Sequence, residues 1–255
     1  MIFLAMTNNN IYFVANWKMF GLKSSINKID KVINLTKKNT FKKINIIYCP
    51  PSTILSIFAN KLRNSKIKIG AQNIFYTENF GPHTGNVNAK MIKDSGASYV
   101  ILGHSENRNE GETDLVINKK IKAALKEKIK VIFCFGEKLR DRNNKKTSNV
   151  LKKQILNALK GVNDIKNIIF AYEPVWSIGT GKVLKSENLF KDIEKIKGII
   201  RTNFNIKEIN ILYGGSVNTK NIIDLKKVDN LSGFLIGAAS QNQNKFIDII
   251  KKTFN

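Results

Sequence analysis

The chain has 255 residues, of which 42% are hydrophobic, and it carries a formal net charge of +24 at pH 7. This length and hydrophobic content suit one large α/β domain and exclude a disordered chain, and no apolar run approaches the ~20 residues that span a bilayer. The charge comes from lysines scattered over most of the chain rather than from one basic stripe with interleaved aromatic residues, so it does not favour a nucleic-acid partner.

Eight short apolar runs have the length and the β-branched content of buried strands. In chain order, they are residues 11–15, 44–49, 67–71, 99–102, 131–135, 167–170, 209–212 and 231–236. Helix-length segments alternate with them, at residues 24–38, 52–62, 113–127, 148–159 and 186–201, then in two segments that end near residues 227 and 252. Residues 72–88 and the polar run 140–147 are predicted to be loops.

This alternation predicts an α/β fold in which a parallel sheet with right-handed crossovers closes into a single (β/α)8 barrel. An open, doubly wound sheet is the alternative. Because no linker or low-complexity tract divides the chain, we expect one domain over residues 1–255. Residues 1–10 are expected to form a short N-terminal extension, since residues 1–6 lack the features of a signal peptide.

Polar side chains follow several of the predicted strands. They are Asn16, Lys18, His104, Glu106, Glu173 and Ser216. Since the carboxyl ends of parallel strands share one face of a barrel, we expect these residues to converge there. The small-residue turns at 214–216 and 237–240 leave backbone N–H groups at helix starts, which suits a phosphate dianion.

Residues 171–182, A-Y-E-P-V-W-S-I-G-T-G-K, predict a catalytic base followed by a closing lid. Glu173 follows a buried strand, and Pro174 ends that strand because it cannot donate to a ladder. Gly179 and Gly181 supply backbone freedom for a segment that moves. The alternative interpretation is an acidic strand-end residue with an ordinary glycine-rich connector.

Two other kinds of site are not supported by the sequence. Residues 179–182 are not a P-loop, because Val183 replaces the required Ser or Thr. With two histidines and no cysteine near either, a metal site is not expected. Cys49 and Cys134 form no C-x-x-C pair, which indicates a reducing cytoplasm and no disulfide.

Five segments together resemble the signature segments of the triosephosphate isomerase family, in order and in spacing. They are residues 16–18 (N-W-K), 103–106 (G-H-S-E), 171–182, 213–217 (Y-G-G-S-V) and 237–240 (G-A-A-S). The resemblance implies a glycolytic and gluconeogenic isomerase that interconverts dihydroxyacetone phosphate and D-glyceraldehyde 3-phosphate through an enediolate. It implies no cofactor and no metal. The alternatives are another barrel enzyme for a small phosphorylated substrate, or a polyanion-binding protein on an isomerase scaffold.

The resemblance also implies residue roles. Glu173 is the expected base, His104 the electrophile, kept neutral by a helix dipole, and Lys18 the catalytic cation. The expected substrate-binding residues are Asn16, Lys18, Gly179, Ser216, Gly237 and Ala238. The lid is Val175, Trp176, Ser177, Ile178, Gly179, Thr180, Gly181 and Lys182, and supporting residues are Ser105, Glu106, Cys134 and Tyr213.

The long loop around residues 75–86 implies a homodimer, with His83 and Thr84 as contacts, and no membrane or nucleic-acid partner. In the resembled family this loop inserts into a second subunit near the catalytic lysine. The sequence departs from the family pattern at Asn86 and Asn107, where the family commonly has an acid and an arginine. It also departs in the lid, at Ser177 and in the hinge Val183-Leu184, and in the phosphate turn, where Ala238 replaces a common glycine.

Overall fold

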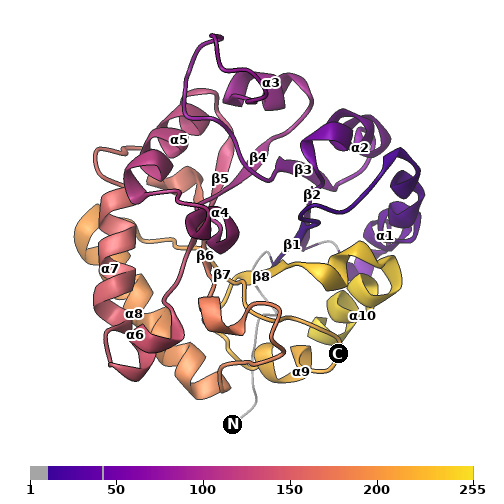
Figure 1. Ribbon diagram of the computed structural model, residues 1–255. Coiled ribbons are helices and arrows are strands. Elements are labelled where there is room, and N and C mark those ends of the chain that lie inside the picture. The colour runs from indigo at the N-terminus through magenta and orange to yellow at the C-terminus, as the bar shows by residue number, and fades with distance from the viewer. Residues whose placement is uncertain (1–10, 42, 255) are drawn as a thin grey trace.

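The computed structural model describes residues 11–41 and 43–254, and in it eight parallel strands close into a barrel (Figure 1). Each strand pairs with the next in sequence, and β8 pairs with β1. The strands are β1 Ile11–Asn16, β2 Ile44–Cys49, β3 Lys68–Ala71, β4 Tyr99–Leu102, β5 Lys130–Phe135, β6 Ile168–Tyr172, β7 Ile211–Tyr213 and β8 Gly233–Ile236. The predicted barrel is confirmed, and the open sheet is excluded. The expected extension at residues 1–10 lies outside the described residues.

The strands form from continuous apolar runs because both of their faces are covered. All five residues of β6 are buried, for example. One set of side chains fills the barrel interior, and its aliphatic members are Val14, Ile47, Ile101, Ile132, Ile169, Leu212 and Leu235. The other set faces outward and packs against the surrounding helices in one larger cluster. No helix in the described part of the chain is long and apolar enough to cross a membrane.

Helices surround the barrel and cover the outer faces of the strands (Figure 1). The α-helices are α1 Asp30–Thr36, α2 Leu55–Leu62, α3 Ala89–Asp94, α4 Ser105–Asn109, α5 Asp114–Lys126, α6 Leu139–Asn143, α7 Thr147–Ala158, α8 Ser186–Phe204, α9 Ile222–Leu225 and α10 Gln243–Phe254. The 3-10 segments are η1 Lys23–Ile29, η2 Asn39–Phe41, η3 Ser52–Ile54, η4 Ile165–Asn167, η5 Val175–Ser177 and η6 Ala238–Gln241. In α5, Ile117, Ile121 and Ala124 are buried at helical spacing, so one stripe faces the strands.

The structure differs from the sequence prediction in its short helices. The prediction of a loop at residues 140–147 is wrong at its start, because Leu139–Asn143 forms α6. The backbone N–H of Lys138 donates to the carboxylate of Asp141 (3.2 Å), which satisfies one of the free donors at the start of α6. The first half of the predicted helix at 24–38 is the 3-10 segment η1.

Candidate active site

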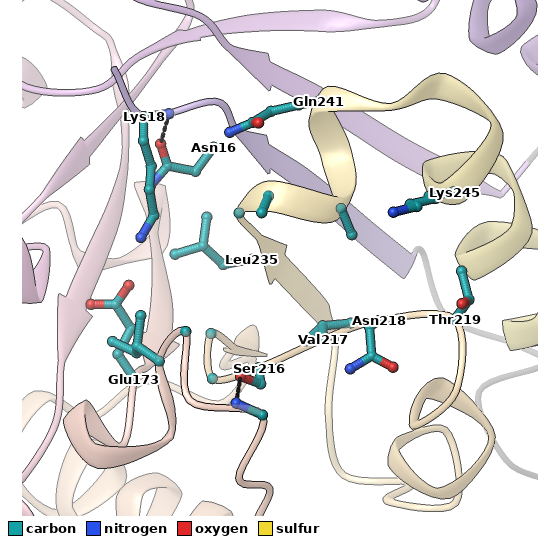
Figure 2. Close-up of a pocket in the computed structure, with 18 of the residues that line it drawn as sticks. Asn16, Lys18, Glu173, Ser216, Val217, Asn218, Thr219, Leu235, Gln241 and Lys245 are labelled. Atoms are coloured by element: carbon teal, nitrogen blue, oxygen red, sulfur yellow. Dashed lines mark hydrogen bonds between the residues drawn. The ribbon is translucent and has the colours of Figure 1, made fainter. Parts of the chain in front are cut away.

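Of the polar residues that follow the strands, all but Glu106 line one cavity of about 680 Å³ at the carboxyl end of the barrel (Figure 2). The structure places the expected catalytic and substrate-binding residues on its wall. They are Asn16, Lys18, His104, Glu173, Gly179, Ser216, Gly237 and Ala238. They come from β1, β4, β6, β7 and β8 or the loops that follow, so the barrel topology brings together groups that are far apart in sequence.

Glu173 is held in place through its backbone and its carboxylate, and its side chain is only 2% exposed. Its N–H donates to the carbonyl of Phe135 (3.1 Å), which continues the β5–β6 ladder. A Cβ at Gly136 would lie 1.7 Å from the carbonyl oxygen of Glu173, so only glycine lets β5 and this residue approach so closely. The N–H of Ser105 donates to Oε2 of the carboxylate (3.1 Å). The candidate base is therefore buried and positioned from two sides.

His104 caps the N-terminus of α4 and contacts Glu173. Its Nδ1 accepts the backbone N–H of Glu106 (3.2 Å), so in the neutral ring the proton is on Nε2. Nε2 lies 3.0 Å from Oε1 of Glu173. Because His104 lines the cavity, its Nε2–H is the donor that an electrophile requires.

The pKa of His104 departs from the sequence expectation. Burial lowers the pKa of His104, but the charge of Glu173 and the hydrogen bond to it raise this pKa more, so it lies above its ordinary value. This shift is opposite to the one expected from the helix dipole alone. The main cause of the raised pKa of His104 is the carboxylate of Glu173, and the charge of Glu106 contributes as well.

Lys18 occupies the left-handed region, with φ of 55°, which is unusual for a residue other than glycine. Its N–H donates to Oδ1 of Asn16 (3.0 Å). Gln72 Nε2 donates to the carbonyls of Lys18 (2.9 Å) and Cys49 (2.8 Å). The amino group of Lys18 lies 2.5 Å from Oε1 of Glu106. The sequence analysis missed Gln72, although it directly follows a predicted strand, as the other site residues do.

Hydrogen bonds connect the turn after β7 to the lid, and the turn after β8 to the residue that follows β1. Ser216 donates from its hydroxyl to the carbonyl of Ser177 (2.7 Å) and accepts the N–H of Gly181 (3.3 Å), as Figure 2 shows for the second contact. Trp17 donates from its indole to the carbonyl of Ser240 (3.2 Å). A Cβ at Gly237 would lie 3.3 Å from Cε of Lys18, so the β8 turn and the lysine are adjacent.

The start of the lid is anchored by a buried network that the sequence analysis did not identify. Trp176 donates from its indole to Glu137 (3.2 Å), and Arg142 donates from Nε to the same carboxylate oxygen (2.8 Å). Arg142 also donates to the hydroxyl of Tyr172 (3.0 Å) and pairs with Asp192. The position of Glu137, directly after the fifth predicted strand, was the available signal. Asp192 carried no such signal in the sequence, because it lies on a helix and does not follow a strand.

Of the remaining residues that the sequence analysis singled out, two are buried and two are exposed. Cys134 is buried, and burial and then the nearby charge of Glu173 raise its pKa well above the usual range, so it stays a thiol. Tyr213 is buried beside the lid, since a Cβ at Gly215 would lie 2.3 Å from both the hydroxyl of Tyr213 and that of Ser177. His83 and Thr84 are exposed and do not line the cavity.

A parallel barrel with a buried carboxylate and an imidazole at its carboxyl mouth, beside two turns suited to phosphate, defines an enzyme for a small phosphorylated substrate. A model of the triosephosphate isomerase family matches residues 11–253. The chain therefore belongs to the triosephosphate isomerase family, and the prediction from its sequence segments is confirmed. Its activity class is that of an aldose–ketose isomerase with a role in glycolysis.

Known triosephosphate isomerases are similar to this chain over nearly its whole length. The triosephosphate isomerase of Thermodesulfovibrio yellowstonii is 42% identical over 244 residues, which cover 94% of this chain and 98% of that protein. The enzyme of Alkaliphilus oremlandii is 39% identical over 246 residues, with 92% and 96% covered. A crystal structure of the Bartonella henselae triosephosphate isomerase has a TM-score of 0.86 and 31% identity, and the match covers 95% of this chain and 98% of that one.

Proposed function

We propose that this chain interconverts dihydroxyacetone phosphate and D-glyceraldehyde 3-phosphate by moving one proton between adjacent carbons through an enediolate. The single observation that carries the proposal is the contact between Glu173 Oε1 and His104 Nε2 (3.0 Å) on the wall of a cavity that also holds the two phosphate-type turns. A base, a hydrogen-bond donor and an anion site are the three groups that this reaction requires.

The proton transfer follows from the positions of these groups. The carboxylate of Glu173 takes the proton from one substrate carbon, and the electron pair of the C–H bond forms the C=C bond of the enediolate. The N–H at Nε2 of His104 donates to the oxygen on which negative charge develops. At Nε2, His104 gives its proton to this oxygen and takes the hydroxyl proton of the other substrate oxygen, so that the carbonyl and the hydroxyl exchange places. Glu173 then returns its proton to the neighbouring carbon. Because one carboxylate can reach both adjacent carbons, a second base is not needed.

The remaining groups bind the anionic substrate. The N–H groups of the turns at Gly237-Ala238 and at Ser216 hold the phosphate, as backbone donors at such turns do; their position on the cavity wall supports this role. Lys18 adds a fixed positive charge on the same wall. The lid, with Gly179 on that wall, closes over the phosphate and excludes water, which protects the enediolate from losing its phosphate.

A coupled assay that follows conversion of D-glyceraldehyde 3-phosphate to dihydroxyacetone phosphate tests this function. The purified full-length chain is expected to show turnover without added cofactor. A folded chain with no turnover in either direction would contradict the proposal.

We also propose that this single-domain enzyme works in the cytoplasm, where its buried cysteines Cys49 and Cys134 remain free thiols.

We further propose that the enzyme is a homodimer, because apolar side chains are exposed directly after the catalytic lysine and on the long loop. Met19 and Leu22, just after Lys18, are 95% and 74% exposed, and Phe80 on the long loop is 74% exposed. Surfaces of this kind mark protein interfaces. In the proposed dimer, Thr84 lies beside Asn16 and Glu106 of the partner subunit and completes the site.

The dimer is expected to become tighter as moderate salt is added. Each subunit carries +24, so association brings like charges together, and salt screens this repulsion over a Debye length of ~8–10 Å. Sedimentation equilibrium across a salt series measures the dissociation constant. A chain that stays monomeric and fully active at every dilution would contradict the dimer. A dimer that salt weakens would contradict the electrostatic part.

A further inference from the structure

The wall of the catalytic cavity includes residues beyond those proposed to hold the substrate. Two of them are Lys220, in the segment before α9, and Lys245, in the first turn of α10. In Figure 2 the amino end of Lys245 points from α10 toward the turn after β8. The sequence analysis gave these lysines no role, and the isomerase reaction does not use them.

The cavity is larger than a triose phosphate requires. A triose phosphate has ten atoms other than hydrogen, and at the ~30 Å³ that a water molecule occupies in the liquid this amounts to roughly 300 Å³ at most. The cavity holds about 680 Å³. The cavity therefore has room for more than the substrate, and the two lysines are among the residues of its wall.

The wall of the cavity also carries more positive than negative side chains. Glu173 is the one carboxylate among the residues of the wall, against the amino groups of Lys18, Lys220 and Lys245. Lys18 is paired with Glu106. In the ranges that the structure describes, the side chains of Lys220 and Lys245 form no hydrogen bond and no ion pair, so both amino groups are available to a ligand.

We propose that Lys220 and Lys245 form an outer anion subsite that takes the second phosphate of a small bisphosphorylated compound. The first phosphate of this compound occupies the turns at Ser216 and Gly237, so the proposal rests on the proposed phosphate site. Such a compound spans both parts of the cavity, prevents the substrate from entering, and acts as a competitive inhibitor. Compounds with one phosphate leave the two lysines unused and bind more weakly.

Inorganic phosphate and tripolyphosphate serve as probes, with binding measured by calorimetry at one ionic strength. The full chain is expected to bind tripolyphosphate about tenfold more tightly than it binds phosphate, because the two exposed lysines attract the added charge together. In the double variant Lys220→Gln/Lys245→Gln this ratio is expected to fall below about threefold, and each single variant is expected to lie between. The matched control is Lys251→Gln, which removes the same charge from the exposed side of α10 and is expected to keep the full ratio.

The outcomes separate the subsite from the proposed function. An unchanged ratio in the double variant, or an equal fall in Lys251→Gln, would overturn the outer subsite. Phosphate that binds each variant as it binds the parent chain shows that the inner site is intact and the variants are folded. If phosphate fails to compete with glyceraldehyde 3-phosphate in the coupled assay, the inner site is wrong and the proposed function loses its phosphate site as well.

Discussion

Replacing Glu173 by glutamine is expected to lower kcat by about 10²–10⁴, the usual contribution of a general base. The amide has almost the same shape and can still accept the N–H of Ser105, but it cannot take a proton from carbon. Glu173→Asp keeps the base and withdraws it by one methylene, so a smaller loss is expected. The coupled assay measures kcat, and circular dichroism shows whether both variants fold.

The matched control is Glu187→Gln, which removes an exposed carboxylate from the first turn of α8. Its kcat is expected to stay within about twofold, since it lies outside the cavity wall. If Glu173→Gln kept more than about a tenth of the parent activity, Glu173 could not be the base. The proton would then have to be taken by another group on the same wall.

Replacing Lys18 by alanine is expected to lower kcat and raise KM together. The charge of the lysine acts on the phosphate-bearing ground state and on the enediolate, so its loss affects both constants. Charge-assisted hydrogen bonds contribute ~1.5–3 kcal/mol, which corresponds to a fall in kcat/KM of roughly 10–150-fold. Steady-state kinetics at constant ionic strength measures both constants.

Lys122→Ala, on the exposed face of α5, is the control for this variant. It removes the same charge from the same net +24 and is expected to change neither constant. Equal effects from the two variants would mean that the overall field of the protein, and not a placed cation, governs substrate binding. An effect of Lys18→Ala on KM alone would limit the lysine to ground-state binding.

The sequence predicted the barrel and the location of the site because both depend on local signals. A strand that is buried on both faces reads as a continuous apolar run, and a polar residue that directly follows it must lie at the mouth. His104, Glu173 and Ser216 were found in this way. The exposed loop at residues 72–88 was equally visible, since it lacks both strand and helix periodicity.

The parts that the sequence did not predict depend on contacts between distant elements. Arg142 forms ion pairs with Glu137 and Asp192, which come from different parts of the chain. In the sequence, each of these three residues alone looks like an ordinary charged residue on the surface. The left-handed backbone of Lys18 has no sequence signal, because lysine rarely adopts it. The raised pKa of His104 likewise requires the position of Glu173, which lies 69 residues away and is visible only in the folded chain.

The pairing of β1 with β8 also affects how the chain is made. Tyr12–Ala15 pairs with Gly233–Ile236, so one edge of the first strand has no partner until more than two hundred further residues have left the ribosome. At ~5–20 residues per second, this takes roughly 10–45 s. An unpaired strand edge can pair with another chain during that time. The abundant lysines repel neighbouring nascent copies of the chain during this time. The high net charge therefore opposes aggregation through the free edge of β1 before the barrel has closed and the active site has formed.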